Sequence, residues 1–337
     1  MKVPSHQNAQ FNQIAGDSAD SIRMGNMNMQ AMDAQPRVVV VMLTLNQRET
    51  TLRALRSMSP EERHRFAVVL WDNGSSDGTA EAVANEFPEV VVHHEPENLG
   101  VASGRNAGAK LAIERFDPTH LLFLDNDMVL QPGFPEALLA PFRDDDRVGQ
   151  TQAKLLFLGD PQRINDGGGC QINFWTGRTD PVGFNEIDRG QCDSVAPCIS
   201  CGGAMMVRVD LFQQLGGFDS IFDPFGPEDL DFSLRLQALG FKALYIPSAV
   251  AHHAVSHTFE GGEYTAVYAH SKAKHWLRFL RRHGTPVQKL GFALVGAPLI
   301  AVRMTARELL RGNPGAVIGS VRGLFEALRG HGGSGNR

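Results

Sequence analysis

Cysteine, tyrosine and tryptophan are scarce in this sequence: its 337 residues include four Cys, three Tyr and three Trp. Four cysteines in a chain of this length do not make the disulfide framework of a small secreted protein. The N-terminus also lacks the basic, apolar and cleavable pattern of an export signal. We therefore predict a protein of the reducing cytoplasm.

Long apolar runs are missing as well. A helix needs about 20 predominantly apolar residues to cross a bilayer. The most apolar stretch near the C-terminus, residues 290–302, has only thirteen apolar or small residues. We expect this stretch to be too short to span a membrane.

Negative charge is nearly absent from the C-terminal part of the chain. Residues 270–337 contain twelve Lys and Arg but only two acids, which gives +10, so residues 1–269 carry −15 within the total of −5. The acidic part is not expected to bind nucleic acid, whereas basic, amphipathic helices are attracted to anionic membrane surfaces. The alternative is that these helices pack on the body of the protein.

Composition and hydrophobic pattern divide the chain into four parts. Residues 1–35 are rich in Met, Asn and Gln and are predicted to be disordered. Residues 36–150 alternate apolar strands with helices over short connections, which is typical of a doubly wound α/β fold that binds ligands beyond its strand ends. The third part is residues 151–262: the chain is less regular over 150–200, and order returns at Ala204–Val209 and at the helix Glu228–Leu239. Residues 263–337 are predicted to be helical and membrane-associating.

Two regions that follow predicted strands contain polar residues and glycines. Asp72 ends the second strand, and Gly74 behind it lets a ligand approach the backbone. Gly104 and Gly108 share a helix face and leave Arg105 beside the helix N-terminus, where a diphosphate binds well. Structural alternatives are a turn with a helix cap after Asp72 and close helix–sheet packing at the two glycines.

The strongest signal is the apolar strand 121–124, which leads directly into Asp125 and Asp127. If the strand continues, its period of two puts both carboxylates on the same side. Two carboxylates repel each other unless a cation lies between them, and hard oxygen ligands select Mg²⁺ or Mn²⁺. A simple turn is the alternative.

A second acidic pair, Glu228 and Asp229, begins a predicted helix. These acids either match the helix dipole or include a catalytic base. The doublet of His252 and His253 follows a short predicted strand, and one of the two can complete a metal site.

The four cysteines, at positions 170, 192, 198 and 201, include one C-x-x-C pair, Cys198 and Cys201. A structural zinc site at this pair is one alternative, and free buried thiols are the default expectation.

Taken in order, these segments resemble the family 2 glycosyltransferases of the GT-A fold, especially bacterial rhamnosyltransferase-like members. The resemblance extends from residue 38 to residue 283. It rests on six segments, residues 44–46, 72–75, 98–108, 125–127, 201–206 and 228–231. It implies an α/β fold with a Rossmann-like mixed sheet flanked by helices, and a basic, amphipathic helical appendage at the C-terminus.

The resemblance also implies roles for individual residues. Asp229 would be the general base, supported by Glu228. The cation, Mn²⁺ or Mg²⁺, would be held by Asp125, Asp127 and His253, with the choice between His252 and His253 left open. Asp72 would hold the nucleobase. The full set implied to bind the nucleotide-sugar is Thr44, Asn46, Asp72, Asn73, Gly74, Gly104, Arg105, Asp125 and Asn126.

The implied function is an inverting transfer of a sugar from a UDP- or dTDP-type donor to a hydroxyl of a glycan or lipid-linked acceptor. The expected setting is cell-surface polysaccharide biosynthesis at the inner face of the cell membrane. Two alternatives stay open. One is a non-catalytic, glycosyltransferase-like scaffold at the membrane. The other is a nucleotidyltransferase, which would need a glycine-rich basic loop that residues 44–48 lack.

Overall fold

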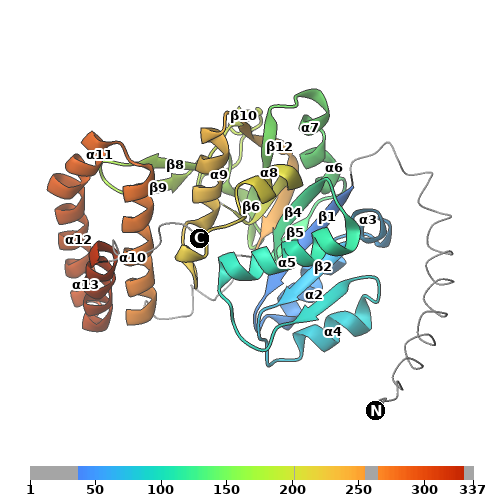
Figure 1. The fold of residues 1–337 in the computed structure, drawn as a ribbon, viewed down its shortest axis with the longest axis horizontal. Helices are drawn as coiled ribbons and strands as arrows, with labels where there is room; N and C mark the ends of the chain where they lie inside the picture. Colours follow the sequence, from blue (N-terminus) through green and yellow to red (C-terminus); the bar gives the residue numbers. More distant parts are fainter. Residues whose placement is uncertain (1–36, 201, 255–264, 330–337) are drawn as a thin grey trace, which may run out of the picture. The chain divides into compact units, whose positions relative to one another are not determined.

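The computed structural model describes residues 37–200, 202–254 and 265–329. The tail predicted to be disordered, residues 1–35, lies outside the described residues. The centre of the described chain is a mixed sheet with the strand order β10-β12-β6-β11-β4-β1-β2-β3 (Figure 1). The predicted α/β class with a mixed sheet flanked by helices is confirmed.

The first half of the sheet is parallel. Strand β1 (Val38–Thr44) lies between β2 (Val68–Asp72) and β4 (His120–Asp125), and β3 (Val91–His94) extends the sheet beyond β2. The helices of this half are α2 (Arg48–Arg56), α3 (Pro60–Phe66), α4 (Thr79–Glu86) and α5 (Val101–Phe116).

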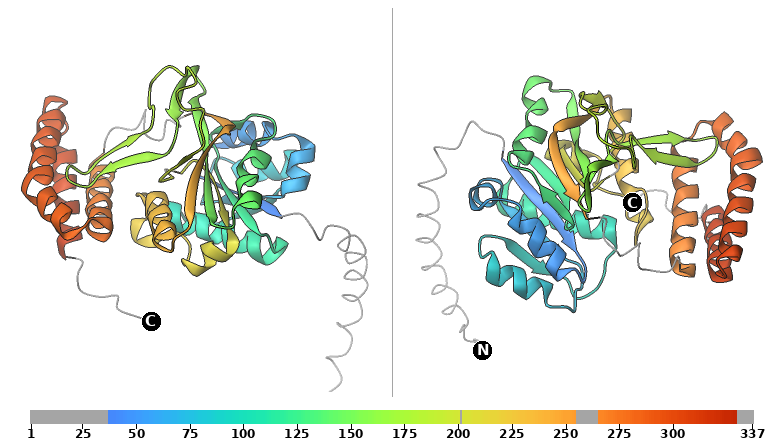
Figure 2. Two further views of the ribbon diagram at one scale, coloured as in Figure 1. Left: turned by 90° about the horizontal axis from the view of Figure 1, so that it is seen from above. Right: turned by 180° about the vertical axis from the view of Figure 1, so that it is seen from behind.

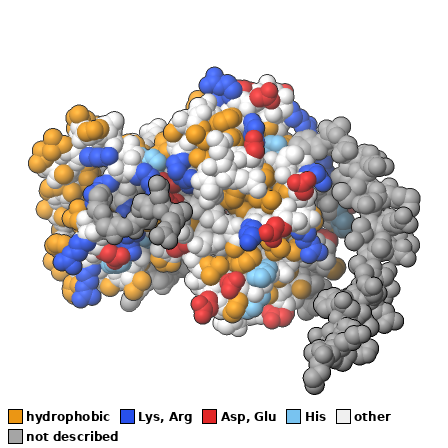
Figure 3. Space-filling model, in the orientation of Figure 1, with side chains coloured by type: hydrophobic (Ala, Val, Ile, Leu, Met, Phe, Trp, Pro, Cys, Tyr) orange, Lys and Arg blue, Asp and Glu red, His pale blue; other side chains and the backbone are white. Residues whose placement is uncertain are grey.

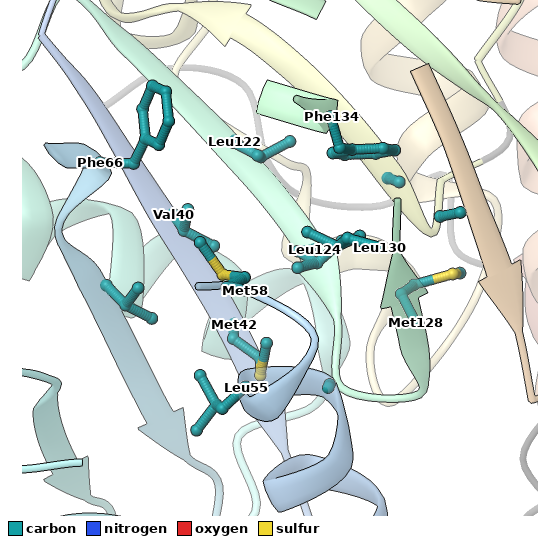
Figure 4. Close-up of a cluster of buried hydrophobic side chains, with 14 of the residues drawn as sticks. Val40, Met42, Leu55, Met58, Phe66, Leu122, Leu124, Met128, Leu130 and Phe134 are labelled. Atoms are coloured by element: carbon teal, nitrogen blue, oxygen red, sulfur yellow. The ribbon is translucent and has the colours of Figure 1, made fainter. Parts of the chain in front are cut away.

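Both faces of this half are covered, which explains its unbroken apolar strands. Val40 and Met42 point to the face covered by α2 and α4, whereas Val39 and Val41 point to the face covered by α5. Figure 4 shows the first of these faces, where the β1 side chains meet Leu55 and neighbouring residues. Because successive side chains of β1 point to opposite faces, this one strand contributes to two hydrophobic cores.

The second half of the sheet adds antiparallel strands. Strand β11 (Ala204–Arg208) runs antiparallel to β4 and to β6 (Val148–Phe157), and β12 (Lys242–His253) runs parallel to β6. The remaining elements are β5 (Met128–Leu130), α6 (Phe134–Leu139), α7 (Pro141–Asp144), β7 (Asp160–Asp166), β8 (Cys170–Asn173), β9 (Arg178–Pro181), β10 (Ala196–Pro197), α8 (Val209–Gln214) and α9 (Glu228–Ala238). Strands occupy much of 150–200, which was expected to be less regular.

The C-terminal region is helical, as predicted. It contains α10 (Ala266–His283), α11 (Pro286–Gly291), a π-helical segment (Phe292–Gly296), α12 (Ala297–Leu310) and α13 (Pro314–Arg329). From Pro286 to Leu310 these pieces form one helix of 25 residues, which is long and apolar enough to cross a membrane by length and composition alone. The prediction that this stretch is too short is therefore wrong, because the helix extends beyond the apolar run at both ends.

Helix α10 joins this region to the sheet domain (Figure 2). Arg282 and His283 at its end bind Asp231 of α9, at 2.9 and 2.8 Å. Burial alone would raise the pKa of Asp231, but the hydrogen bonds from His283 and Arg282 lower it to about 2. On its other side α10 packs against α13, whose Gly319 and Gly323 leave no room for a Cβ against the α10 backbone. Packing on the body, the alternative interpretation, is correct for α10.

Candidate active site

The predicted acidic motif lies where β4 ends. The strand stops at Asp125, a two-residue turn follows, and β5 begins at Met128. The strand therefore does not continue through Asp127, and the argument from its period of two does not hold. The two carboxylates have separate partners: Asp125 binds Arg105, and Asp127 faces His253.

The contact of Asp127 with His253 is produced by pairing between strands. His253 lies opposite Met128 in the β5–β12 ladder, which brings its Nε2 to 3.2 Å from Oδ2 of Asp127. Its Nδ1 donates to Oδ1 of Asn165 at 2.9 Å, which fixes the ring orientation. His252 instead contacts the Gln131 amide at 3.3 Å. Of the histidine doublet, His253 is thus the one at the acidic motif.

Burial opposes protonation of His253, but its hydrogen bond to Asp127 and the charges of Asp127 and Asp125 raise its pKa. An imidazole nitrogen beside a carboxylate is a donor set that suits Mn²⁺. Asp125 is instead bound by Arg105, whose Nη2 lies 2.6 Å from its Oδ1. Within the described residues no three His, Cys, Asp or Glu side chains are grouped to hold an ion. Asp127 and His253 fit a cation that takes further ligands from a bound diphosphate. Asp125 as a third protein ligand stays a prediction.

Arg105 connects the acidic motif to the start of α9. It is buried, and its Nη1 lies 3.0 Å from Oε1 of Glu228 while Nη2 binds Asp125. The contacts of Arg105 are thus with two carboxylates, and its place near the donor sugar or diphosphate stays a prediction. The N-terminus of α5 is occupied by the carboxylate of Asp223, which accepts from the backbone N–H of Ala102 at 2.9 Å and from Oγ of Ser103.

Glu228 and Asp229 stand at the first turn of α9, as the sequence predicts. Burial is the main reason that the pKa values of both carboxyl groups are raised. Oδ1 of Asp229 accepts from the Leu230 N–H at 2.7 Å, and a Cβ at Gly202 would collide with its Oδ2. Glu228 is thus committed to Arg105, whereas Asp229 has the geometry and the raised pKa of a proton acceptor near neutral pH.

Two of the residues predicted to bind the nucleotide-sugar are buried instead in a polar network under α2. Nδ2 of Asn126 donates to Oγ1 of Thr44 and to Oγ1 of Thr51, both at 3.0 Å. Thr44 is 2% exposed and Asn126 is 8% exposed. They fasten α2 to the end of the sheet, and their contact with a donor stays a prediction.

Two further predicted residues have packing roles. Nδ2 of Asn73 donates to the Gly100 carbonyl and to Asn98, and its Oδ1 accepts from the Leu99 N–H, so this side chain holds the loop before α5. A Cβ on Gly104 would come within 2.7 Å of Leu43 in β1. The alternative interpretation, close helix–sheet packing, is correct there.

Asp72, Gly74 and Asn46 gather at the ends of β1 and β2. Oδ1 of Asp72 accepts from the Ser75 N–H at 2.9 Å, and Oδ2 lies 3.0 Å from Nδ1 of His94. Asn46 binds the same turn through its own N–H, which donates to Oγ of Ser75 at 2.8 Å. Gly74 has a φ of 95°, which favours glycine in this turn. His94 also lines a neighbouring cavity of about 600 Å³.

Sequence reasoning missed His94, Asn165 and Asp223. The doublet of His93 and His94 at a strand end was a usable signal, because β3 is the neighbour of β2. Asn165 and Asp223 carry no local pattern, since their partners lie 88 and about 120 residues away along the chain.

The cysteines Cys170, Cys192 and Cys198 are free thiols. Burial raises the pKa of the Cys198 thiol well above its usual range. Its C-x-x-C partner, Cys201, lies outside the described residues.

The geometry can be compared with that of known proteins. The family described as glycosyl transferase family 2 matches residues 39–216, more than half of the chain. The chain belongs to glycosyl transferase family 2. A second, shorter match, to the N-terminal domain of galactosyltransferase, covers residues 195–266. This enzyme is accordingly a glycosyltransferase that uses a nucleotide-sugar donor.

Among curated relatives, the chain is 25% identical over 280 residues to an N-acetylglucosaminyl-diphospho-decaprenol L-rhamnosyltransferase of Mycobacterium tuberculosis, covering 77% of this glycosyltransferase and 89% of the relative. GalNAc-T7, solved with UDP, GalNAc and Mn²⁺, is similar in fold, with a TM-score of 0.58 and 20% identity over 74% of this chain and 48% of the other. This glycosyltransferase thus spans about half the length of GalNAc-T7.

A third similar protein is the mannosyltransferase PcManGT from Pyrobaculum calidifontis, solved with GDP-Man and Mn²⁺. Its TM-score is 0.52, with 18% identity over 89% of each chain. The likeness to both solved structures shows that the fold is of the GT-A type, as predicted.

Proposed function

We propose that this family 2 enzyme transfers a sugar, with inversion, from a UDP- or dTDP-type donor to a hydroxyl of a lipid-linked glycan in cell-surface polysaccharide biosynthesis. The observation that carries the proposal is the Arg105 bridge, which joins Asp125 of the acidic motif to Glu228 at the start of α9. Through this bridge the acidic motif, where Asp127 faces His253, and the start of α9, which carries Asp229, form one charged cluster.

In the proposed reaction Asp229 accepts the proton of the acceptor hydroxyl as this oxygen attacks the anomeric carbon. A single displacement of this kind inverts the anomeric configuration. Glu228 holds Arg105, and the pair positions the first turn of α9. The raised pKa of Asp229 brings it close to working pH, where a general base is most effective.

Asp127 and His253 are the residues that would hold a divalent cation, with Asn165 fixing the histidine ring. When bound, Mn²⁺ or Mg²⁺ would neutralise the charge of the leaving nucleoside diphosphate. The Mn²⁺ in the solved structures of GalNAc-T7 and PcManGT supports this choice of ion.

The nucleoside is proposed to bind at the ends of β1 and β2. Asp72 can accept a hydrogen bond from a pyrimidine imide, and the adjacent cavity is lined by Ser75, Ser76 and His94. Asn46 and Gly74 shape the turn that borders it. Thr44 and Asn126 support this edge from beneath.

The membrane location is proposed from the exposed helix Pro286–Leu310. Figure 3 shows apolar side chains gathered over the C-terminal helices, with Lys and Arg among them. Gly291 and Gly296, in the first half of this helix, pack directly on Trp175 of the β8–β9 connection. A helix held along its first half against the β8–β9 connection suits the interface rather than a span, and a half-exposed Trp suits the same depth.

A lipid-linked acceptor fits this location and is also named for the mycobacterial relative. The enzyme is proposed to work at the cytoplasmic face of the membrane. Family membership favours an enzyme over the two alternatives, a non-catalytic scaffold and a nucleotidyltransferase.

The test is a screen of UDP- and dTDP-sugars by thermal shift and calorimetry with Mn²⁺, with Mg²⁺ and with chelator. We expect donor binding that needs the cation and that Asp127→Ala abolishes. Nucleotide affinity that is unchanged in excess chelator would contradict the metal assignment, and hydrolysis of a sugar nucleotide by wild-type protein would separate the enzyme from a scaffold.

A further inference from the structure

A cavity lies inside the C-terminal region, away from the candidate active site. Its volume is about 390 Å³, within the range of small-molecule pockets, roughly 300–1,000 Å³. It is enclosed by α10, α12, α13 and the β8–β9 hairpin. The domain arrangement in Figures 1 and 2 places this hairpin between the sheet and the C-terminal helices.

One end of the cavity is apolar. A Cβ at Gly177, in the hairpin, would meet Phe292 at 2.8 Å, Leu280 at 3.2 Å and Ile300 at 3.3 Å. Trp276 completes the apolar lining on α10. Such a surface binds a hydrocarbon chain, because removal of apolar area from water is favourable.

The other end is basic. Lys272 of α10 and Arg303 and Arg307 of α12 line the cavity, and no Asp or Glu of the described residues lines it. Although Lys272 as a residue is exposed, burial of its ammonium group and the charge of Arg307 lower its pKa. Arg307 also binds Glu308 at 2.6 Å, but this carboxylate does not line the cavity. The arrangement gathers positive charge and has room for an anion.

A buried polar atom points to the same ligand. Ser320 of α13 is 1% exposed and lines the cavity, and its hydroxyl has no hydrogen-bond partner. A buried hydroxyl without a partner costs free energy unless a ligand or water supplies the bond. A phosphate oxygen is an acceptor that suits it.

The basic end is also connected to the candidate active site. The Lys272 ammonium lies 5.6 Å from the Tyr268 ring centroid, and Tyr268 stacks on Phe225 at 4.9 Å. Phe225 stands three residues before Glu228 in the chain. The opposite end of α10 is bound to Asp231 of α9. A headgroup at the basic end would therefore lie at the approach to the catalytic helix.

We propose that this cavity binds the lipid carrier of the acceptor, with its hydrocarbon chain against Phe292 and Leu280 and its phosphate at Lys272 and Arg303. The proposal rests on the proposed function, because it names where that acceptor is held. The exposed apolar face of Pro286–Leu310 gives the chain a way in from the membrane.

The experiment measures binding of farnesyl phosphate to the full-length chain, with farnesol and inorganic phosphate as separate probes. We expect saturable binding of farnesyl phosphate, and binding at least about 10-fold weaker for either probe that lacks one part, since each good charge-assisted contact contributes about that factor. Equal binding of farnesol would overturn the phosphate assignment, and equal binding of inorganic phosphate would overturn the role of the apolar end.

A charge-matched pair of variants separates the cavity from the general positive charge. Lys272→Gln with Arg303→Gln removes two cations that line it, and Lys289→Gln with Arg322→Gln removes two cations that do not. We expect at least about 10-fold weaker binding only for the first pair. Equal loss in both pairs would overturn the site in favour of non-specific attraction.

A second matched pair tests the volume. Ala301→Phe fills the cavity, whereas Ala306→Phe places the same ring on an exposed part of α12 that does not line it. Only Ala301→Phe is expected to abolish saturable binding. Wild-type affinity in both would overturn the proposal.

Two further measurements show whether the bound lipid is the carrier or a general phospholipid. They also separate this proposal from the proposed function. Nanodiscs of phosphatidylglycerol that compete with farnesyl phosphate at equal concentration would show a general phospholipid site and overturn the carrier assignment; no competition supports it. Mn²⁺-dependent donor binding, measured on the same samples, should be normal in all four variants. A failure of donor binding in wild-type protein would reject the proposed function alone, while lipid binding still reports on the cavity.

Discussion

In strand β1 the residues Val38–Met42 are at most 3% exposed. In the helix Pro286–Leu310, by contrast, only 6% of the most apolar stretch of 18 residues is buried. Fourteen large apolar side chains are exposed on the C-terminal helices, against eight on the rest of the described chain. The strand has helices on both faces of its sheet, while the long helix contacts protein on one side only. Apolar sequence thus forms a core in one region. In the other region it forms an exposed surface that needs a different apolar environment.

The largest effect should come from the chemical centre of the sheet domain. Asp229→Asn keeps the shape and much of the hydrogen bonding but cannot accept a proton, so turnover should fall at least about 100-fold. Donor and Mn²⁺ affinity should stay normal, and the melting temperature should stay within a few degrees, because loss of a helix-dipole contact costs only about 1 kcal/mol. Turnover, calorimetry and melting should be measured on one preparation. Near-normal turnover would exclude Asp229 as the base and make Glu228 the next candidate.

A smaller effect is expected when Asn165, which contacts His253 of the proposed metal-binding pair, is substituted. Asn165→Ala removes the acceptor for Nδ1 of His253, and loss of such an outer contact typically weakens metal binding about 10–100-fold. Asn165→Asp keeps an oxygen acceptor and should restore most of the affinity. The matched control is Gln131→Ala, which removes the contact of His252. Mn²⁺ titration of donor binding is the measurement; equal affinity in Asn165→Ala and the control would show that the ring needs no such support.

The C-terminal surface can be tested with a charge-matched pair of double variants. Leu294→Asp with Val302→Asp places two charges on exposed apolar positions of the long helix, and Val195→Asp with Leu239→Asp does the same on the sheet domain. Only the first should reduce co-sedimentation with anionic liposomes, by at least about 10-fold, because burying one such side chain contributes roughly 1.5–3 kcal/mol. High salt should weaken the remaining electrostatic attraction. Wild-type liposome binding by the helix variant would assign this surface to a protein partner.

Acid should have the smallest effect, on both regions alike. Burial, above all, lowers the pKa of His120 in β4 and of His275 in α10 to about 4. Each histidine binds protons less readily in the folded state than in the unfolded state, where its pKa is about 6.5, so its contribution to stability falls as pH drops below that value. From pH 7 to pH 5.5 each should cost about 1 kcal/mol.

His120→Asn and His275→Gln should each flatten the dependence of the melting temperature on pH over this range. His275 donates from Nδ1 to the Phe225 carbonyl, at 2.7 Å, so its variant should also loosen α10 from the sheet domain. Limited proteolysis of the C-terminal helices at pH 5.5 would report this loosening. An unchanged pH dependence in both variants would show that other groups control acid stability.

The elements with local patterns could be predicted from the amino-acid sequence alone. The unbroken apolar run at Val38–Met42 predicts a strand buried on both faces, and the glycines at 104 and 108 predict close packing as one of two interpretations. The acids at 125, 127, 228 and 229 were found because strand ends and helix starts carry recognisable residues. The family followed from the order of these segments.

Which of those residues contact one another became clear only from the folded chain. Arg105 binds Asp125 and Glu228, Asp223 occupies the N-terminus of α5, and His253 faces Asp127 because β5 pairs with β12. These contacts join residues that lie far apart along the chain, so they depend on strand order and register, to which no local pattern gives access. For the same reason Thr44, Asn73 and Asn126, polar residues at strand ends, could be read as ligand contacts, although burial assigns them to holding loops and helices.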